Sequence, residues 1–93
     1  MNKKKLILAR NKIDQLDNSI FNLLKQRTRV VKDMLKLKRY KNQIVDQKRI
    51  NIIIKKIRKK SIKHGIDPKI TTRIWKSIIW SYVNFQRKNF KKK

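Results

Sequence analysis

The sequence of 93 residues contains no cysteine, one histidine, one glycine, one proline and only five acidic residues. Without cysteine, disulfides and thiolate metal sites are excluded. With a single histidine, a metal cluster or triad based on histidine is also excluded. We therefore expect no metal and no cofactor. A chain of this length is expected to form one domain over residues 1–93, with basic tails at 1–5 and 90–93 that fray.

The five acidic residues stand against 29 lysines and arginines, which gives a formal net charge of +24. Such an excess usually indicates binding to nucleic acid or to an anionic membrane surface. The basic residues are nevertheless spread along the whole chain, and Lys, Ile and Asn are abundant throughout, as an AT-rich genome would favour. We therefore interpret most of the charge as a solvated surface.

Long hydrophobic runs are also missing. The apolar run Leu6–Ala9 that follows the basic N-terminus ends at Arg10, which is too short for the apolar region of a signal peptide. No stretch approaches the apolar length needed to span a bilayer. The sequence therefore predicts a cytoplasmic protein.

What is present is a long helical pattern, which predicts one uninterrupted helix from about Lys4 to Arg39. Its seam, with alternating spacings of three and four, consists of Arg10, Ile13, Asp17, Ile20, Leu24, Arg27, Val31, Met34 and Lys38. Three cations on a mostly aliphatic seam need anionic partners, because burying an unpaired cation is costly. Asp17 is one such partner within the chain, and a negatively charged ligand would supply others. Alternatively, the long side chains extend from the edge of the seam into water.

The length of this helix bears on the oligomeric state. At a rise of 1.5 Å per residue, the stretch from Leu6 to Lys38 would be about 50 Å long. A compact globule of this size has a radius of gyration of only about 12 Å. The helix would therefore extend beyond its own monomer with apolar residues exposed, and a second copy of the chain is the simplest cover. We predict a homodimer.

Two shorter helices follow. After a short polar connection over Tyr40–Val45, the first is predicted over Gln47–Lys63, with Asp46 as its N-cap. Gly65 is expected in the left-handed position that ends this helix, and His64 is expected near the helix end rather than in a catalytic site. The apolar face of this helix is formed by Ile50, Ile53, Ile54 and Ile57.

The last helix is predicted over Pro68–Asn89, because Asp67 supplies an N-cap and proline is favoured at the first helical position. Its seam is formed by Ile70, Ile74, Ile78, Tyr82 and Phe85, and Gln86 lies four residues beyond Tyr82 on the same face. No strand, repeat or long linker is predicted. The fold class is therefore all-α, with one long and two shorter helices.

Several polar residues follow one another in a distinctive order. They are Arg10-x-x-Ile13-Asp14-x-x-Asp17, Leu23-Leu24-x-x-Arg27, Lys38, Asp46-x-x-Arg49 and Gln86. Each motif alone is weakly specific, whereas their order and spacing together are fairly specific. From Leu6 to about Lys88 the chain resembles the all-helical (type II) chorismate mutase family. The resemblance implies that the three helices form an intertwined homodimer.

The resemblance also implies the substrate chorismate, a dicarboxylate that rearranges to prephenate in aromatic amino-acid biosynthesis. By this analogy Arg10 reaches across from the partner protomer to one carboxylate, and Arg27 binds the other. Lys38 and Gln86 donate hydrogen bonds to the ether oxygen of the breaking bond. Asp46 and Arg49 line the pocket. The reaction is unimolecular, so it needs positioned donors rather than a nucleophile, a metal or a general base.

Two positions depart from the family pattern and leave a second activity open. The family usually has Glu where this chain has Ile50, and often Ser where it has Tyr82. Both residues look similar to those of the isochorismate pyruvate-lyase branch of the same fold, which yields salicylate and pyruvate. Both positions are expected to line the substrate pocket. In the alternative interpretation, Ile50 simply joins the apolar core of its helix.

A different class of function rests on charge alone, namely a small basic helical protein that binds nucleic acid. A helix-turn-helix needs a short first helix and a tight turn, which the long first helix does not provide. The aromatic residues Trp75, Trp80, Tyr82 and Phe85 have helical spacing, which favours core or interface positions over base stacking. A salt-sensitive gel shift without activity on chorismate would identify this class. A coiled-coil scaffold fits less well, because its seam would not place three cations among aliphatic residues.

Overall fold

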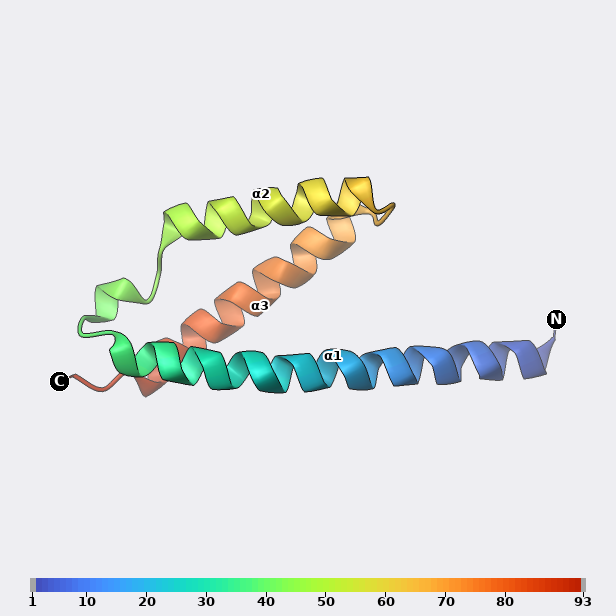
Figure 1. Ribbon diagram of the computed structural model, residues 1–93, viewed down its shortest axis with the longest axis horizontal. Coiled ribbons are helices and arrows are strands. Elements are labelled where there is room, and N and C mark those ends of the chain that lie inside the picture. The colour runs from blue at the N-terminus through green and yellow to red at the C-terminus, as the bar shows by residue number, and fades with distance from the viewer. Residues whose placement is uncertain (1, 93) are drawn as a thin grey trace. The chain divides into compact units, whose positions relative to one another are not determined.

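The structure is a computed structural model that describes residues 2–92, and within this range it contains three α-helices and no strand (Figure 1). Helix α1 covers Lys3–Leu37, α2 covers Gln47–Lys63 and α3 covers Pro68–Asn89. A short 3₁₀ helix, η1, lies at Lys41–Gln43 between α1 and α2. The predicted all-α fold with one long and two shorter helices is confirmed.

The sequence predicted that α1 would end at about Arg39, but the helix ends at Leu37. The N–H of Lys38 still donates to the carbonyl of Leu35 at 3.2 Å, which tightens the final turn. The next two N–H groups, those of Arg39 and Tyr40, instead donate to the side-chain oxygen Oε1 of Gln43, at 2.8 and 2.9 Å. A side chain from beyond the helix therefore replaces the carbonyl acceptors that would have continued it.

The predicted signals at the ends of α2 and α3 are confirmed. The carboxylate of Asp46 accepts a hydrogen bond from the N–H of Arg49 at 3.0 Å and so caps α2. Gly65 follows α2 with φ +72°, a conformation that a residue with a side chain rarely adopts. Asp67 caps α3 by accepting from the N–H of Lys69 at 2.9 Å, one residue beyond Pro68.

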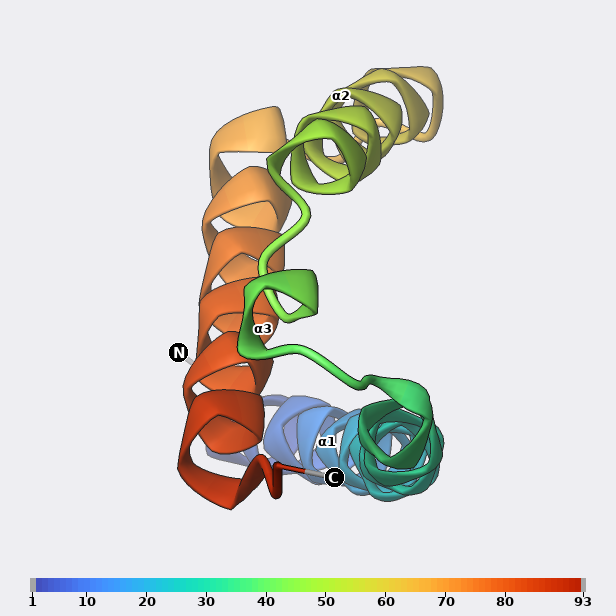
Figure 2. The same ribbon diagram turned by 90° about the vertical axis from the view of Figure 1, so that its left-hand side faces the viewer.

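The connection before α2 is more ordered than the predicted polar loop, since it contains the short helix η1 (Figure 2). It also contains an apolar residue that anchors it to the core. Ile44 is only 6% exposed and belongs to the core, and Val45 packs against the same core. Val45 directly precedes the N-cap of α2, while Ile50 occupies the fourth helical position. This is the arrangement of a hydrophobic staple, which fixes the angle at which the chain enters the helix.

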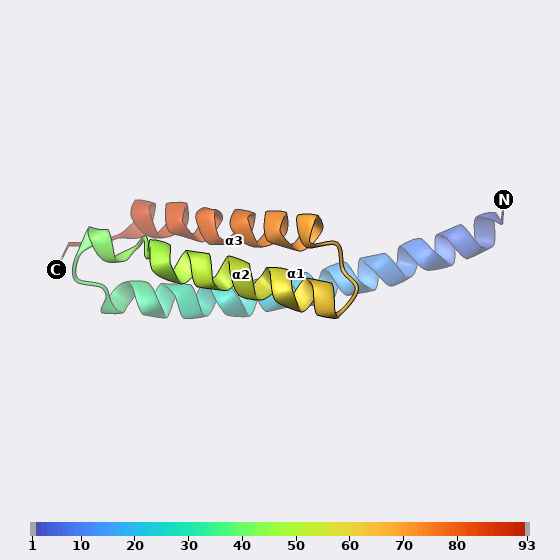
Figure 3. The same cartoon turned by 90° about the horizontal axis from the view of Figure 1, so that it is seen from above.

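By its contacts the chain divides into two compact units, one ending at Val31 and the other beginning at Lys32. In the second unit α2 and α3 form an antiparallel hairpin (Figure 3). The core of this unit consists of Ile44, Ile50, Ile79 and Val83, with Val45, Ile53, Ile54 and Phe90 packed against it. This core holds together three segments: the connection before α2, the start of α2 and the C-terminal half of α3.

The first unit consists of α1 up to Val31 and exposes most of its apolar side chains. Two residues of the predicted seam, Ile13 and Ile20, are 57% and 56% exposed. Other exposed apolar residues of this unit are Leu6, Ile7, Leu8, Leu16, Phe21, Leu23 and Val30. The described chain therefore leaves uncovered an apolar surface of the kind that a partner usually covers.

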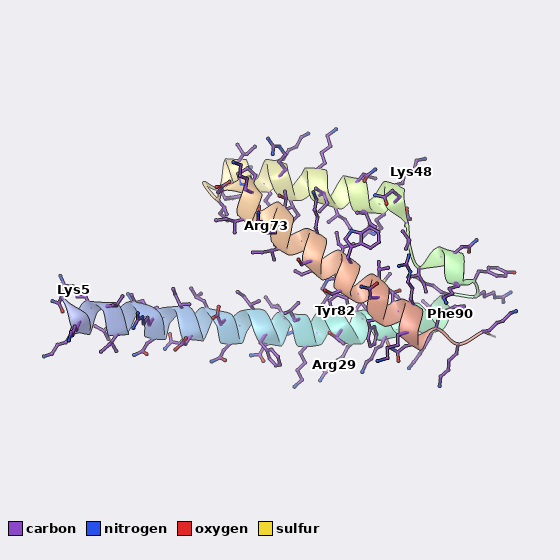
Figure 4. The ribbon with its side chains drawn as sticks, turned by 180° about the vertical axis from the view of Figure 1, so that it is seen from behind. Lys5, Arg29, Lys48, Arg73, Tyr82 and Phe90 are labelled. Carbon is purple, nitrogen blue, oxygen red and sulfur yellow. The ribbon has the colours of Figure 1, made fainter. Side chains whose placement is uncertain are left out.

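The two ends of the chain were predicted to fray, and this stays a prediction, as does the single domain over residues 1–93. Residues 3–5 belong to α1. Phe90, just beyond α3, packs against the core of the second unit (Figure 4). Met1 and Lys93 lie outside the described residues. Between residues 2 and 92, no helix combines the length and the apolar character that crossing a membrane requires.

Candidate active site

A partly buried polar contact joins the residue that follows α1 to the last turn of α3. The ammonium of Lys38 donates to the side-chain oxygen Oε1 of Gln86 at 2.7 Å, across 48 residues of sequence. Gln86 is only 8% exposed and is one of the few buried polar side chains among the described residues. It lies one turn beyond Tyr82 and three residues after the core position Val83, so the helical face that contributes to the core also places Gln86 inward.

The contact fixes which way the Gln86 amide faces. An ammonium only donates, so the amide atom that faces Lys38 is the oxygen. The amide nitrogen Nε2 donates one hydrogen to the backbone carbonyl of Tyr82 at 3.2 Å. An NH₂ group has two hydrogens and an ammonium has three, so further N–H donors stay available on both side chains. The pair is therefore a source of preorganised donors.

Two opposing effects act on the charge of Lys38. Burial lowers the pKa of its ammonium below the usual 10.5, while the nearby carboxylate of Asp46 raises it. Burial is the larger effect, so the pKa is lowered overall. A partly desolvated cation interacts more strongly with a negative charge than one in bulk water. The site is therefore suited to bind an anion, or to stabilise negative charge that develops on an oxygen.

Asp46 connects the site to the start of α2. Its carboxylate caps the helix through the N–H of Arg49 and thereby takes a fixed position. From there it acts on Lys38 electrostatically. The side chain of Arg49 lies in the first turn of α2 and is exposed. One carboxylate thus both starts α2 and supports the cation at the end of α1.

The remaining predicted residues of the second unit have different environments. Ile50 is 9% exposed and is a member of the core cluster, which favours the interpretation that it fills the core. Its contact with a substrate stays a prediction. Tyr82, labelled in Figure 4, is half-buried on α3, and its backbone carbonyl supports Gln86.

The two arginines predicted to bind carboxylates, Arg10 and Arg27, belong to the first unit. Both lie on α1, where Arg10 is exposed and Arg27 is half-buried. The second unit by itself brings together Lys38, Gln86 and Asp46. The contribution of the two arginines to this site stays a prediction.

One polar residue beside the site was not predicted. Gln43 holds the backbone directly after Lys38 through the two hydrogen bonds that end α1. In the sequence it is a glutamine in a polar connection, and it belongs to no periodic pattern or motif that would indicate a role. The bonds depend on how the connection folds back, which local patterns do not reveal.

The effect of Asp46 on Lys38 yields a prediction about titration. In Asp46→Asn the amide still caps α2, because Asn is a good N-cap, but the charge that raises the Lys38 pKa is lost. We expect Lys38 to lose its proton at a lower pH than in the wild type, which NMR of the lysine side chain measures. Asp67→Asn, the same change at the cap of α3, is the control and should leave Lys38 unaffected. An unchanged titration in Asp46→Asn would contradict the assigned electrostatic contact.

Comparison with known proteins adds an independent observation. The family described as chorismate mutase type II matches this chain over residues 9–87. A protein named chorismate mutase from Methanocaldococcus jannaschii is 35% identical over an alignment of 80 residues, and the alignment covers 82% of this chain and 78% of that protein. No solved structure matches the chain significantly. The matched region contains every residue predicted for the site, from Arg10 to Gln86.

Proposed function

The chain belongs to the type II chorismate mutase family, and we propose that it converts chorismate to prephenate at a site built around Lys38 and Gln86. The observation that carries the proposal is the 2.7 Å contact between these two side chains. It places two donors of different chemistry together in a partly dehydrated site. A cytoplasmic location is part of the same proposal.

The reaction needs fixed donors at one atom. As the bond between the ether oxygen and carbon breaks, negative charge grows on the oxygen. The ammonium of Lys38 and the second hydrogen of the Gln86 amide both donate to this oxygen. The first amide hydrogen stays on the carbonyl of Tyr82 and holds the amide in place. Little reorganisation is then needed as the charge develops, which is the source of the rate enhancement.

The two substrate carboxylates require further cations. Arg27 binds one carboxylate, because the planar guanidinium matches a carboxylate with two parallel hydrogen bonds. Arg10 of a second protomer binds the other. Arg49 and Asp46, at the start of α2, orient the charges around the substrate. Holding both carboxylates selects the compact substrate conformer in which the reacting carbons are close.

The site is complete only in a homodimer. The apolar residues exposed on α1 up to Val31 supply the surface that a second copy covers. A second copy is the partner because a two-fold interface buries the same apolar stripe on both chains at once. The same association brings Arg10 of one protomer to the site of the other.

This arrangement predicts complementation between inactive variants. Arg10→Ala and Lys38→Ala are each expected to be nearly inactive, since each lacks one part of the site. When the two proteins are unfolded together and refolded, about half of the dimers are mixed, and each mixed dimer has one intact site of its two. We expect the mixture to recover about a quarter of the wild-type chorismate turnover.

The matched control is the mixture of Arg27→Ala with Lys38→Ala. Both residues come from the same protomer of a site, so every site in the mixed dimer lacks one of them. This mixture should show no recovery. Equal recovery in both mixtures, or a fully active monomer in sedimentation, would exclude the proposed sharing of Arg10.

The alternative activities have no support among the comparisons, which name only chorismate mutases. For the isochorismate pyruvate-lyase, the argument from the sequence rested on Ile50 and Tyr82. Ile50 belongs to the core cluster of the structure, so its apolar character has a structural reason that does not involve substrate choice. For nucleic-acid binding, the high charge remains the single argument.

A further inference from the structure

The side chain of Gln43 makes two hydrogen bonds directly behind the proposed catalytic lysine. Its oxygen Oε1 accepts from the N–H of Arg39 at 2.8 Å and from the N–H of Tyr40 at 2.9 Å. These are the first two backbone N–H groups after Lys38. One side-chain atom therefore fixes the backbone of the two residues that directly follow Lys38.

These bonds decide where the helix ends. Neither glycine nor proline occurs near Lys38, so nothing in the local sequence forces α1 to stop there. In a continuing helix the N–H groups of Arg39 and Tyr40 would donate to carbonyls four residues earlier. Because Gln43 accepts both, Lys38 lies just beyond the last helical residue, Leu37.

The backbone next to Gln43 is fixed by the same core that fixes the segment of α3 before Gln86. The backbone N–H of Gln43 donates to the carbonyl of Tyr40 at 3.0 Å, which closes the turn of η1. The next residue, Ile44, is buried in the cluster that includes Val83, three residues before Gln86. The backbone behind Lys38 and the acceptor of its ammonium are therefore fixed to one packed unit.

We propose that Gln43 is a positioning residue for the rearrangement, which holds the backbone after Lys38 so that the ammonium reaches Gln86 and the ether oxygen together. The proposal rests on the proposed function for its kinetic consequence, but its structural part does not depend on activity. Both bonds use only the oxygen of the side chain, so an acceptor at this position is sufficient. Glutamate therefore preserves the contact, whereas leucine, of similar size, removes it.

The kinetic experiment compares Gln43→Leu, Gln43→Glu and the wild type, with Asn42→Leu as control for an apolar residue in the same exposed connection. Small displacements of a catalytic group are known to cost up to about 100-fold in rate. We expect Gln43→Leu to lower kcat by about tenfold or more with a smaller change in KM, because the ground-state contacts of the arginines remain. Gln43→Glu should restore kcat, and Asn42→Leu should leave it unchanged.

A second measurement is independent of turnover. The lowered pKa of Lys38 arises chiefly from its burial, so in Gln43→Leu the Lys38 titration, followed by NMR, should move back toward that of an ordinary lysine. Amide hydrogen exchange of Arg39 and Tyr40 should also become faster. A merely stabilising residue would lower the melting temperature without moving the titration of Lys38. Should Gln43→Leu fail to fold, Gln43→Ser, whose hydroxyl is too short to reach both N–H groups, replaces it.

The outcomes separate this inference from the proposed function. If the wild type does not convert chorismate, the proposed function fails, while the titration and exchange of the variants still test the role of Gln43. If chorismate is converted but the variant without the acceptor keeps the wild-type kcat and the wild-type Lys38 titration, the positioning role is wrong. A loss of kcat in Gln43→Glu equal to that in Gln43→Leu would also overturn it.

Discussion

Lys38→Ala is expected to lower the turnover of chorismate by about two orders of magnitude or more, the scale of removing one preorganised donor. In the proposed mechanism the ammonium donates to the ether oxygen, and its contact with Oε1 at 2.7 Å also fixes the orientation of the Gln86 amide. The substitution therefore removes one donor and releases the other. Steady-state kinetics measure the loss, which should be larger in kcat than in KM, since the ether oxygen carries most charge in the transition state.

The control for this variant is Lys36→Ala, which removes the same charge from an exposed position in the last turn of α1. It should retain the wild-type rate, and circular dichroism should show that both variants keep their helices. If Lys38→Ala turns over chorismate at a rate close to that of Lys36→Ala, the assignment of the site is wrong.

Gln86→Glu is expected to confine activity to acidic pH. Gln86 is neutral and donates at any pH, whereas a carboxyl group donates only when it is protonated. At neutral pH the ionised carboxylate would pair with Lys38 and repel the negative charge on the ether oxygen. We expect a loss of about two orders of magnitude near neutral pH, the cost of one lost donor, with recovery as the pH falls.

The sign of this effect follows from the two groups involved. Burial raises the pKa of the introduced carboxyl group, and the neighbouring ammonium of Lys38 lowers it. The active form is the protonated one, which is present below that pKa.

In the wild type, none of the groups assigned to the chemistry has a reference pKa between about 6 and 8, so the pH profile should be nearly flat there. His64, at the C-cap of α2, is the one histidine, and His64→Ala should leave this profile unchanged. A flat profile at full rate in Gln86→Glu would show that Gln86 does not contact the breaking bond.

The helices and their ends were predictable where the signal is local. Asp46, Asp67 and Gly65 each act on backbone groups within a few residues, so the sequence alone located the ends of α2 and the start of α3. The end of α1 was predicted two residues too late. Its stop signal is the side chain of Gln43, which reaches back to the chain only after η1 has formed.

The site was predictable in part. The helical period placed Gln86 on the inner face of α3, but nothing in the period of α1 pairs it with Lys38, which lies 48 residues away. Their association was expected from the resemblance to the family, and the structure brings them together. The core position of Ile50 had been one of two interpretations, because an isoleucine fits an apolar core and an apolar pocket wall equally well. Its place in one core cluster with Ile44, a residue of the connection, favours the first interpretation and is not visible in a local pattern.

The most direct test of the central claim is a product assay in which purified protein receives chorismate or isochorismate in parallel reactions. Prephenate, salicylate and pyruvate are separated and quantified over time. We predict prephenate from chorismate as the principal product, with the rate lowered by about two orders of magnitude or more in Lys38→Ala and retained in Lys36→Ala. Salicylate and pyruvate from isochorismate at a higher kcat/KM than prephenate from chorismate, or no conversion of either substrate, would contradict the account.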